Sequence, residues 1–256
     1  FLKNMQHIYI PYIFAEGTFD VDIHADFRDR VLLVSSSNDC CLTQQLLNKY
    51  DAVGQVCTLF QSLQYTEIPW NLYHGTALHI KEKTFVFLGE SGVGKTTAIA
   101  YLTEMQKESI YITEDILIID CKNNCIIPYP RPIHLREGGL RILREIYHIP
   151  MTNVQRVTFH NYKRYILNKK TPDCKLYPVD CYIQLSRKQY TKGYCMEKTV
   201  DDKVKTFTSN CYLPYNVRNN ITCSVMLSGK AELWEIQYSD LADLCDMIFN
   251  LIKNLS

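Results

Sequence analysis

A glycine-rich stretch of the sequence, GESGVGKTT at positions 89–97, has the residue types that bind phosphate groups. Its Gly89, Gly94, Lys95 and Thr96 match every fixed position of the pattern G-x-x-x-x-G-K-[ST]. In such a loop the glycines let backbone N–H groups turn toward phosphate oxygens, and the following helix directs its positive end at the same anion. The lysine bridges the β- and γ-phosphates, and the threonine hydroxyl binds Mg²⁺. The pattern therefore predicts a site for a nucleotide with Mg²⁺, and ATP is the nucleotide that we expect.

The predicted nucleotide contacts extend over the whole stretch. They are Gly89, Glu90, Ser91, Gly92, Val93, Gly94, Lys95, Thr96 and Thr97. A chance match in a glycine-containing turn is the alternative. The flanking sequence disfavours it, because an apolar run precedes the loop and good helix formers follow it, which is the order that a phosphate-binding loop requires.

A pair of carboxylates, Glu114 and Asp115, lies in the middle of the apolar run SIYITEDILIID (109–120). They follow Lys95 by nineteen and twenty residues. In folds with a phosphate-binding loop (P-loop), a strand that normally lies beside the loop strand carries an acidic residue to the metal. Because side chains alternate along a strand, we expect the two carboxylates to point to different places, one toward Mg²⁺ and the other toward an incoming nucleophile. Simple solvation at a strand end is the alternative, and the isoleucines on both sides argue against it.

The segments around these residues are those of an α/β protein. TALHI (76–80) and TFVFLG (84–89) form a hairpin pattern that leads into the loop, and TTAIAYLTEMQK (96–107) is typical of a helix with one apolar face. The run 109–120 is predicted as a buried strand. The segment 123–139 is predicted as mainly loop, because it is rich in proline and glycine.

The rest of the chain gives weaker patterns. The runs 7–14 and 30–37 are typical of strands, whereas 41–50 and 56–63 have an apolar spacing closer to that of short helices. Short β-like runs rich in Lys and Tyr occupy 155–238. The C-terminal segment is predicted as a packing helix that is capped by Ser239 and has an apolar stripe of Leu241, Leu244, Ile248 and Leu251.

Together these patterns predict an α/β fold with a P-loop core, a mixed sheet and an N-terminal β-rich layer. We expect an N-terminal β-rich subdomain at 1–71 and a P-loop domain with the C-terminal packing helix at 72–256. The chain of 256 residues is long enough for one large domain or two small ones.

The composition argues against several classes of protein. The net charge is only +1, so the overall charge gives no reason to expect DNA as a partner. No apolar run is long enough to span a membrane, and the first residues lack the pattern of a signal peptide, so we expect a cytoplasmic protein.

The eleven cysteines are odd in number and include no Cys-x-x-Cys pair, which indicates free thiols rather than disulfides or zinc ligands.

The succession YHGTALHIKEKTFVFLGESGVGKTTAIAYL followed by YITEDILII resembles the catalytic domain of the HPr kinase/phosphorylase family. The shared features are a His-Gly pair, two hairpin strands, the P-loop, a helix and an acidic pair on a strand, and they extend over about residues 72–142. The stretch IIPYPRPIHLREGG (126–139) is similar to a segment of short kinase-like relatives. Some of these act on ribosomally made peptides such as lasso peptides. The resemblance implies an HPr kinase-like fold, related to that of PEP carboxykinase, and a kinase that uses ATP and Mg²⁺ to phosphorylate a Ser or Thr hydroxyl of a peptide or small protein.

The resemblance also implies roles for individual residues. His74, fifteen residues before Gly89, corresponds to an active-site histidine that tunes the base. Glu114 stands where the family has its first Asp, the base that activates the acceptor hydroxyl. Asp115 stands where the second Asp lies near the metal, which Thr96 also binds. Glu114 is one methylene longer than the Asp of the family. The alternative is therefore that Asp115 takes the role of the base, or that the base is weakened.

Other polar residues of interest lie near this region. Arg131 and Arg136 are candidates to neutralise charge in the transition state, and contacts with loop carbonyls or solvent are an equal alternative. His134 lies near the expected site without an assigned role, and His79 is expected to be structural. A later acidic and basic signature of the family is not recognisable here, which weakens the expectation of the reverse phosphorylase activity more than that of the kinase.

Two rival functions stay open from the sequence. One is a kinase for the hydroxyl of a sugar, an amino acid or another small molecule. The other is a nucleotide-binding sensor or interaction protein with little turnover. The resemblance also suggests an oligomer.

The segment 155–205 contains twelve Lys or Arg against five Asp or Glu, and six tyrosines are interleaved with them. A docking surface for an acidic or extended peptide is one interpretation, and single-stranded nucleic acid would suit the same residue types. A solvated face in a sequence rich in Lys, Asn and Tyr is the interpretation that we favour.

Overall fold

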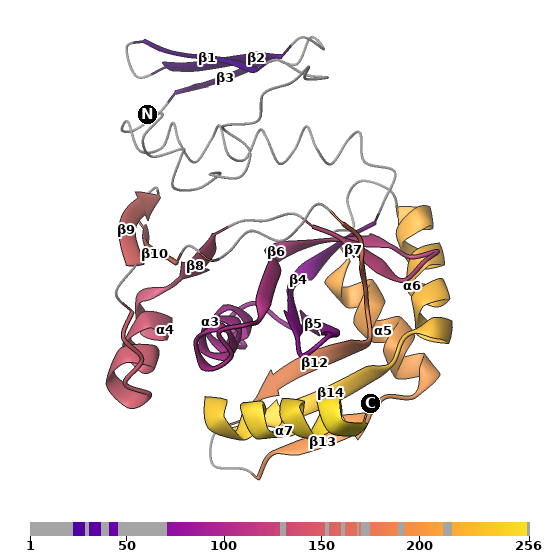
Figure 1. Ribbon diagram of the computed structural model, residues 1–256. Coiled ribbons are helices and arrows are strands. Elements are labelled where there is room, and N and C mark those ends of the chain that lie inside the picture. Colours follow the sequence, from indigo (N-terminus) through magenta and orange to yellow (C-terminus); the bar gives the residue numbers. More distant parts are fainter. Residues whose placement is uncertain are drawn as a thin grey trace.

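The structure is a computed structural model, shown in Figure 1. The residues that it describes are 23–28, 31–36, 41–45, 71–128, 132–151, 154–159, 162–167, 169, 175–188, 192–211 and 217–254.

A three-stranded antiparallel sheet precedes the main part of the chain. Its strands are β1 (Ile23–Arg28), β2 (Val31–Ser36) and β3 (Cys41–Gln45), in the order β1-β2-β3. The strand predicted at 30–37 is confirmed by β2. The short helix predicted at 41–50 is wrong over the five residues of β3, because their backbone pairs with β2 and a run this short does not distinguish a helix from a strand by apolar spacing.

The remaining predictions for the first third, a strand at 7–14 and a short helix at 56–63, lie outside the described residues. The division of the chain at residue 71 stays a prediction.

An eight-stranded mixed sheet carries the candidate site, and its strand order is β11-β7-β6-β4-β5-β12-β14-β13 (Figure 1). The strands are β4 (Asn71–Ile80), β5 (Lys83–Leu88), β6 (Ile110–Asp120), β7 (Cys125–Ile127), β11 (Tyr177–Pro178), β12 (Cys181–Arg187), β13 (Tyr194–Glu197) and β14 (Leu233–Tyr238). β12 is parallel to both β5 and β14, and the other pairs are antiparallel. The predicted mixed sheet is thus confirmed.

The hairpin predicted before the loop is formed by β4 and β5. Its two turn residues, Lys81 and Glu82, have φ of 48° and 64°, the left-handed values that a tight two-residue hairpin turn requires. This hairpin places β4 between β5 and β6. The expectation that the acidic strand lies beside the loop strand is therefore wrong: β6 is one strand removed from β5.

The helices cover both faces of the main sheet (Figure 1). They are α3 (Lys95–Met105), α4 (Glu137–Arg141), the π-helical segment η1 (Ile142–Ile146), α5 (Val200–Asn210), α6 (Val217–Lys230) and α7 (Leu241–Asn254). Alternate side chains of β5 enter two cores. Phe85 and Phe87 pack with α3 and α7, whereas Val86 and Leu88 pack with α5 and α6. The sheet therefore holds the loop that follows β5 between two buried apolar layers.

The predicted C-terminal helix is confirmed, and all four residues of its predicted stripe are buried. Its cap differs from the prediction, because the backbone N–H of Asp243 donates to Oδ1 of Asp240 over 2.9 Å. Asp240 immediately precedes the first helical residue, so it caps the helix in place of Ser239.

Two sequence predictions missed regular structure. The segment 123–139, predicted as mainly loop, contains β7 and a second short strand, β8 (Ile133–Leu135). β8 pairs with β10 (Tyr162–Leu167), which pairs with β9 (Val154–Phe159), in a separate antiparallel sheet. The segment 155–238, predicted as short β-like runs, also contains α5 and α6, whose many β-branched and polar residues are weak helix formers.

Seven cysteines in the described part of the chain are free thiols: Cys121, Cys125, Cys181, Cys195, Cys211, Cys223 and Cys245. Six of these are buried. In that same part, no helix is both long and apolar enough to cross a membrane.

Candidate active site

The glycine-rich loop connects the carboxyl end of β5 to the first residue of α3, as the sequence predicts. Three of its glycines have positive φ, namely Gly89 (141°), Gly92 (89°) and Gly94 (105°). At Gly94 the space is limited as well, because an added Cβ would lie 2.7 Å from the hydroxyl of Tyr238. A residue without a side chain is therefore needed where the loop enters the helix.

Two side chains from distant elements hold the loop in place. The hydroxyl of Tyr238, at the end of β14, donates to the carbonyl oxygen of Val93 over 2.8 Å. The backbone N–H of Gly89 donates to Oδ1 of Asn210, the last residue of α5, over 3.1 Å. The loop is thus fixed near both of its ends before any ligand binds.

The side chain of Lys95 folds back over the loop and is buried. Its Nζ donates to the carbonyl oxygens of Gly89 at 2.6 Å and Glu90 at 3.0 Å. Burial lowers the pKa of Lys95, and the nearby carboxylates of Asp115 and Glu114 oppose that shift because they stabilise the charged form. The buried ammonium group is thus held against the backbone of the loop by these two carbonyl oxygens.

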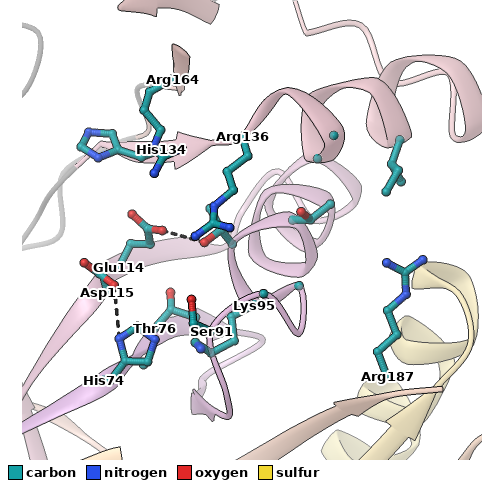
Figure 2. Close-up of a pocket in the computed structure, with 18 residues that line it drawn as sticks. His74, Thr76, Ser91, Lys95, Glu114, Asp115, His134, Arg136, Arg164 and Arg187 are labelled. Atoms are coloured by element: carbon teal, nitrogen blue, oxygen red, sulfur yellow. Dashed lines mark hydrogen bonds and ion pairs between the residues drawn. The ribbon is translucent and has the colours of Figure 1, made fainter. Parts of the chain in front are cut away.

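A cavity of about 410 Å³ lies over the loop (Figure 2). Its walls come from the loop and from β4, β6, β8, β10, β12 and α4. Of the nine predicted nucleotide contacts, six line the cavity: Ser91, Gly92, Gly94, Lys95, Thr96 and Thr97. The other three, Gly89, Glu90 and Val93, offer the backbone groups that bind Lys95, Tyr238 and Asn210.

Glu114 reaches the loop from β6 although β4 lies between the two strands. Its Oε1 accepts a hydrogen bond of 2.7 Å from the hydroxyl of Thr96, and its side chain is buried. Gly75 of β4 lies opposite Asp115, and a Cβ at Gly75 would be 2.7 Å from the carbonyl oxygen of Phe87.

Asp115 has a backbone φ of +70°, a left-handed value that is rare for a residue other than glycine. This backbone conformation bends strand β6 at Asp115. Close to the bend, the hydroxyl of Thr113 donates to the carbonyl oxygen of Ile116 over 2.6 Å. Because of this bend, the simple alternation expected for a strand does not hold, and Glu114 and Asp115 line the same cavity. Unfavourable backbone conformations of this kind concentrate at functional sites.

The two carboxylates nevertheless have different partners. Oδ1 of Asp115 lies 3.2 Å from Nδ1 of His74, on β4, and the side chain of Asp115 is 48% exposed (Figure 2). The Thr96 hydroxyl donates to the buried Glu114 and not to Asp115. This differs from the expectation from the resemblance to HPr kinases, in which Asp115 lies near the metal that Thr96 binds. The geometry therefore separates an inner carboxylate at Thr96 from an outer one at His74.

Three arginines line the cavity, and they come from three different elements: Arg136 precedes α4, Arg164 lies on β10 and Arg187 ends β12 (Figure 2). Sequence reasoning identified Arg136 but not the other two, for which the basic character of 155–205 was the only signal. Arg131, the other predicted arginine, lies outside the described residues.

Of the two other histidines discussed above, His134 and His79, only one lines the cavity. His134, on β8, lines the cavity. His79 lies away from it: Nδ1 is 3.0 Å from the hydroxyl of Thr84, and the ring packs edge-on against Tyr177. These contacts agree with the structural role expected for His79.

The tyrosines of the basic segment 155–205 do not form one surface. Tyr177 and Tyr182 are buried in the core, whereas Tyr194 is exposed and its hydroxyl donates to Oε1 of Glu235 over 2.9 Å. A docking surface built from all six tyrosines is therefore excluded by the burial of two of them.

No protein-family model matches the chain, and no curated protein does. A solved structure to which it is similar is that of the HPr(Ser) kinase/phosphatase from Coxiella burnetii, with 12% sequence identity and a TM-score of 0.35. The match covers 72% of this chain and 94% of that chain. At so low an identity and TM-score the likeness is distant, and the roles of the residues rest on the geometry of this chain.

Proposed function

We propose that the protein is a phosphotransferase that uses ATP and Mg²⁺ to phosphorylate a hydroxyl group. The observation that supports it best is that one cavity holds the loop lysine, an inner carboxylate at Thr96 and an outer carboxylate at His74. Binding of a nucleotide alone would need only the loop. A second, partly exposed carboxylate with its own histidine suits a reaction in which a proton is removed from an acceptor.

The residues at the inner position fit a magnesium ion. The Thr96 hydroxyl and the Glu114 carboxylate are 2.7 Å apart and offer hard oxygen donors, which Mg²⁺ prefers. These two residues would hold the ion together with the phosphates of the nucleotide, and the bound ion would neutralise charge on those phosphates. This assignment gives Glu114 the metal position in place of Asp115.

Asp115 is the base in this proposal, and His74 positions it. The exposed Asp115 carboxylate accepts the proton of the acceptor hydroxyl. The hydroxyl oxygen then forms a bond to the γ-phosphorus, and the bond from that phosphorus to the β,γ-bridging oxygen breaks and leaves ADP. Lys95 and Arg136, which both line the cavity, stabilise the negative charge on the transferred group.

The acceptor that we propose is a Ser or Thr side chain of a peptide or small protein. The outer position of Asp115 supports a large acceptor, because a carboxylate that is 48% exposed can meet a hydroxyl presented on another molecule. A small-molecule hydroxyl would use the same site, so the two acceptor classes are distinguished by the product.

The decisive experiment incubates purified protein with Mg²⁺ and γ-labelled ATP in an extract of its own cells, and the labelled product is identified by its mass shift. Transfer to a Ser or Thr of a peptide supports the proposal, and transfer to a metabolite supports the small-molecule kinase. A Lys95→Ala variant is the control, and it should add no label beyond that of the extract alone, because it lacks the phosphate-binding ammonium. Wild-type protein that binds ATP but adds no label beyond that of the extract alone would instead indicate a nucleotide sensor.

A further inference from the structure

The cavity is chemically different at its two ends. Glu114, Asp115 and His74 gather at one end, and Arg187 lies across the loop from them (Figure 2). If the proposed function is correct, the γ-phosphate lies at the carboxylate end, because the proton acceptor must be beside the reacting group. The triphosphate then crosses the loop, and the nucleoside lies toward Arg187.

The backbone at Arg187 is linked to the loop through Tyr238. Arg187 is the last residue of β12 and lies opposite Tyr238 in the parallel pairing with β14. The next residue, Lys188, donates its backbone N–H to the carbonyl oxygen of Tyr238 over 3.2 Å. Tyr238 in turn binds Val93 of the loop. Arg187 thus lies at the carboxyl end of a parallel strand, the edge where α/β sheets bind their ligands.

Another part of the cavity wall is formed by α4 and the residue that follows it. α4 lies close to the first turn of α3, because a Cβ at Gly139 would be 2.7 Å from the Thr97 hydroxyl. Gly138 and Gly139 both line the cavity and leave the helix backbone uncovered there. Figure 2 shows the helix that follows Arg136 running away from Glu114.

Ile142 is the apolar residue on this wall. It lies one helical turn beyond Gly139, on the same face, and six residues after Arg136, a distance of about 9 Å along a helix. It lines the cavity, is partly buried and packs against the main core. Ile142 also begins the π-helical segment, a departure from α-helical geometry that occurs frequently at functional sites.

We propose that Arg187 and Ile142 hold the base of the nucleotide between them. The planar guanidinium group of Arg187 lies against one face of the base, as guanidinium groups do on aromatic rings, and the Ile142 side chain covers the other face. This inference rests on the proposed function, because it takes the direction of the nucleotide from the reacting end. It assigns a binding role to two residues that the P-loop pattern does not include.

The test compares two ligands that share a triphosphate and differ in the nucleoside. ATP and inorganic tripolyphosphate, each with Mg²⁺, are titrated by calorimetry into wild-type protein and into Arg187→Ala, Arg187→Lys and Ile142→Ala. We expect Arg187→Ala to weaken ATP binding about 3- to 30-fold, the range that a cation–π contact supplies, and to change tripolyphosphate binding less than about twofold. Arg187→Lys should bind ATP nearly as weakly as Arg187→Ala does, because lysine keeps the positive charge but lacks the planar guanidinium group.

Ile142→Ala should likewise weaken ATP and spare tripolyphosphate. The control variant is Arg156→Ala, an exposed arginine of β9 that does not line the cavity, and it should bind both ligands as the wild type does. Thermal unfolding of each variant shows whether it is folded, and the tripolyphosphate titration gives a second check of an intact loop.

Three results would overturn the inference. Equal weakening of both ligands by Arg187→Ala would make Arg187 a phosphate contact, and unchanged ATP binding would remove it from the site. Wild-type protein that binds neither ligand would overturn the nucleotide site itself. ATP binding with the expected ligand difference, but without phosphoryl transfer, would leave the base position correct and only the proposed transferase wrong.

Discussion

The hydroxyl of Thr96 donates a hydrogen bond of 2.7 Å to Oε1 of Glu114, which joins the first turn of α3 to a strand that does not neighbour the loop strand. The adjacent Asp115 contacts His74 instead. Two carboxylates that are consecutive in the sequence therefore have separate environments, and they should respond differently to the same substitution.

Glu114→Gln should act through the metal, and Asp115→Asn through proton transfer. For Glu114→Gln we expect a higher Mg²⁺ concentration at half-maximal turnover, because the inner position loses its charge. For Asp115→Asn we expect a fall in kcat of about 10²- to 10⁴-fold, the usual contribution of a general base, with ATP affinity changed less than about twofold. Steady-state kinetics across a Mg²⁺ series measures both effects. The reverse pattern would return the base to Glu114, as the resemblance to HPr kinases implies.

His74→Ala should lower kcat with little change in ATP affinity, because it removes the partner that positions Asp115. A hydrogen bond to a charged group contributes about 1.5–3 kcal/mol, so we expect a loss of about 10- to 100-fold. His79→Ala is the matched control on the same strand. It loses contacts with Thr84 and Tyr177, so it should lower the unfolding temperature and leave kcat unchanged. Equal losses of activity in the two variants would argue against a specific role for His74.

Gly75→Ala should destabilise the fold by about 1–3 kcal/mol, because its Cβ would lie 2.7 Å from the backbone oxygen of Phe87 and the packing of β4 against β5 would be strained. Gly229→Ala on the exposed face of α6 is the control. A Cβ there meets nothing within 4 Å, so the higher helix propensity of alanine should raise stability by about 0.5–1 kcal/mol. Urea unfolding measures both changes, and a Gly75→Ala protein as stable as the wild type would contradict the close packing.

Stability should fall as the pH rises from about 9 toward 12. Burial raises the pKa of Tyr238, Cys211 and Cys245 to about 12 in the folded protein, whereas their ordinary values are 10.0 for the phenol and 9.0 for the thiols. In this interval the unfolded chain has released protons that the folded chain still binds, so deprotonation favours unfolding. Urea unfolding at pH 8 and pH 10.5 should show the loss. Tyr238→Phe should reduce the pH dependence, and an unchanged slope in that variant would exclude Tyr238 as a contributor.

The sequence by itself predicted the parts of the candidate site that are contiguous in the chain. The P-loop positions Gly89 to Thr97, the helix after them, the hairpin before them and the acidic pair at 114 and 115 all follow from local patterns, because turn geometry and strand or helix periodicity depend on neighbouring residues. The apolar stripe of α7 was identified for the same reason.

Only the tertiary structure decided how these parts meet. The insertion of β4 between β5 and β6 depends on backbone pairing between distant segments, which no local pattern encodes. The bend at Asp115, which overrides strand alternation, and the approach of Arg164 and Arg187 to the loop also depend on contacts far apart in the chain. The partner of each carboxylate, and with it the proposed division of roles between Glu114 and Asp115, follows from that packing.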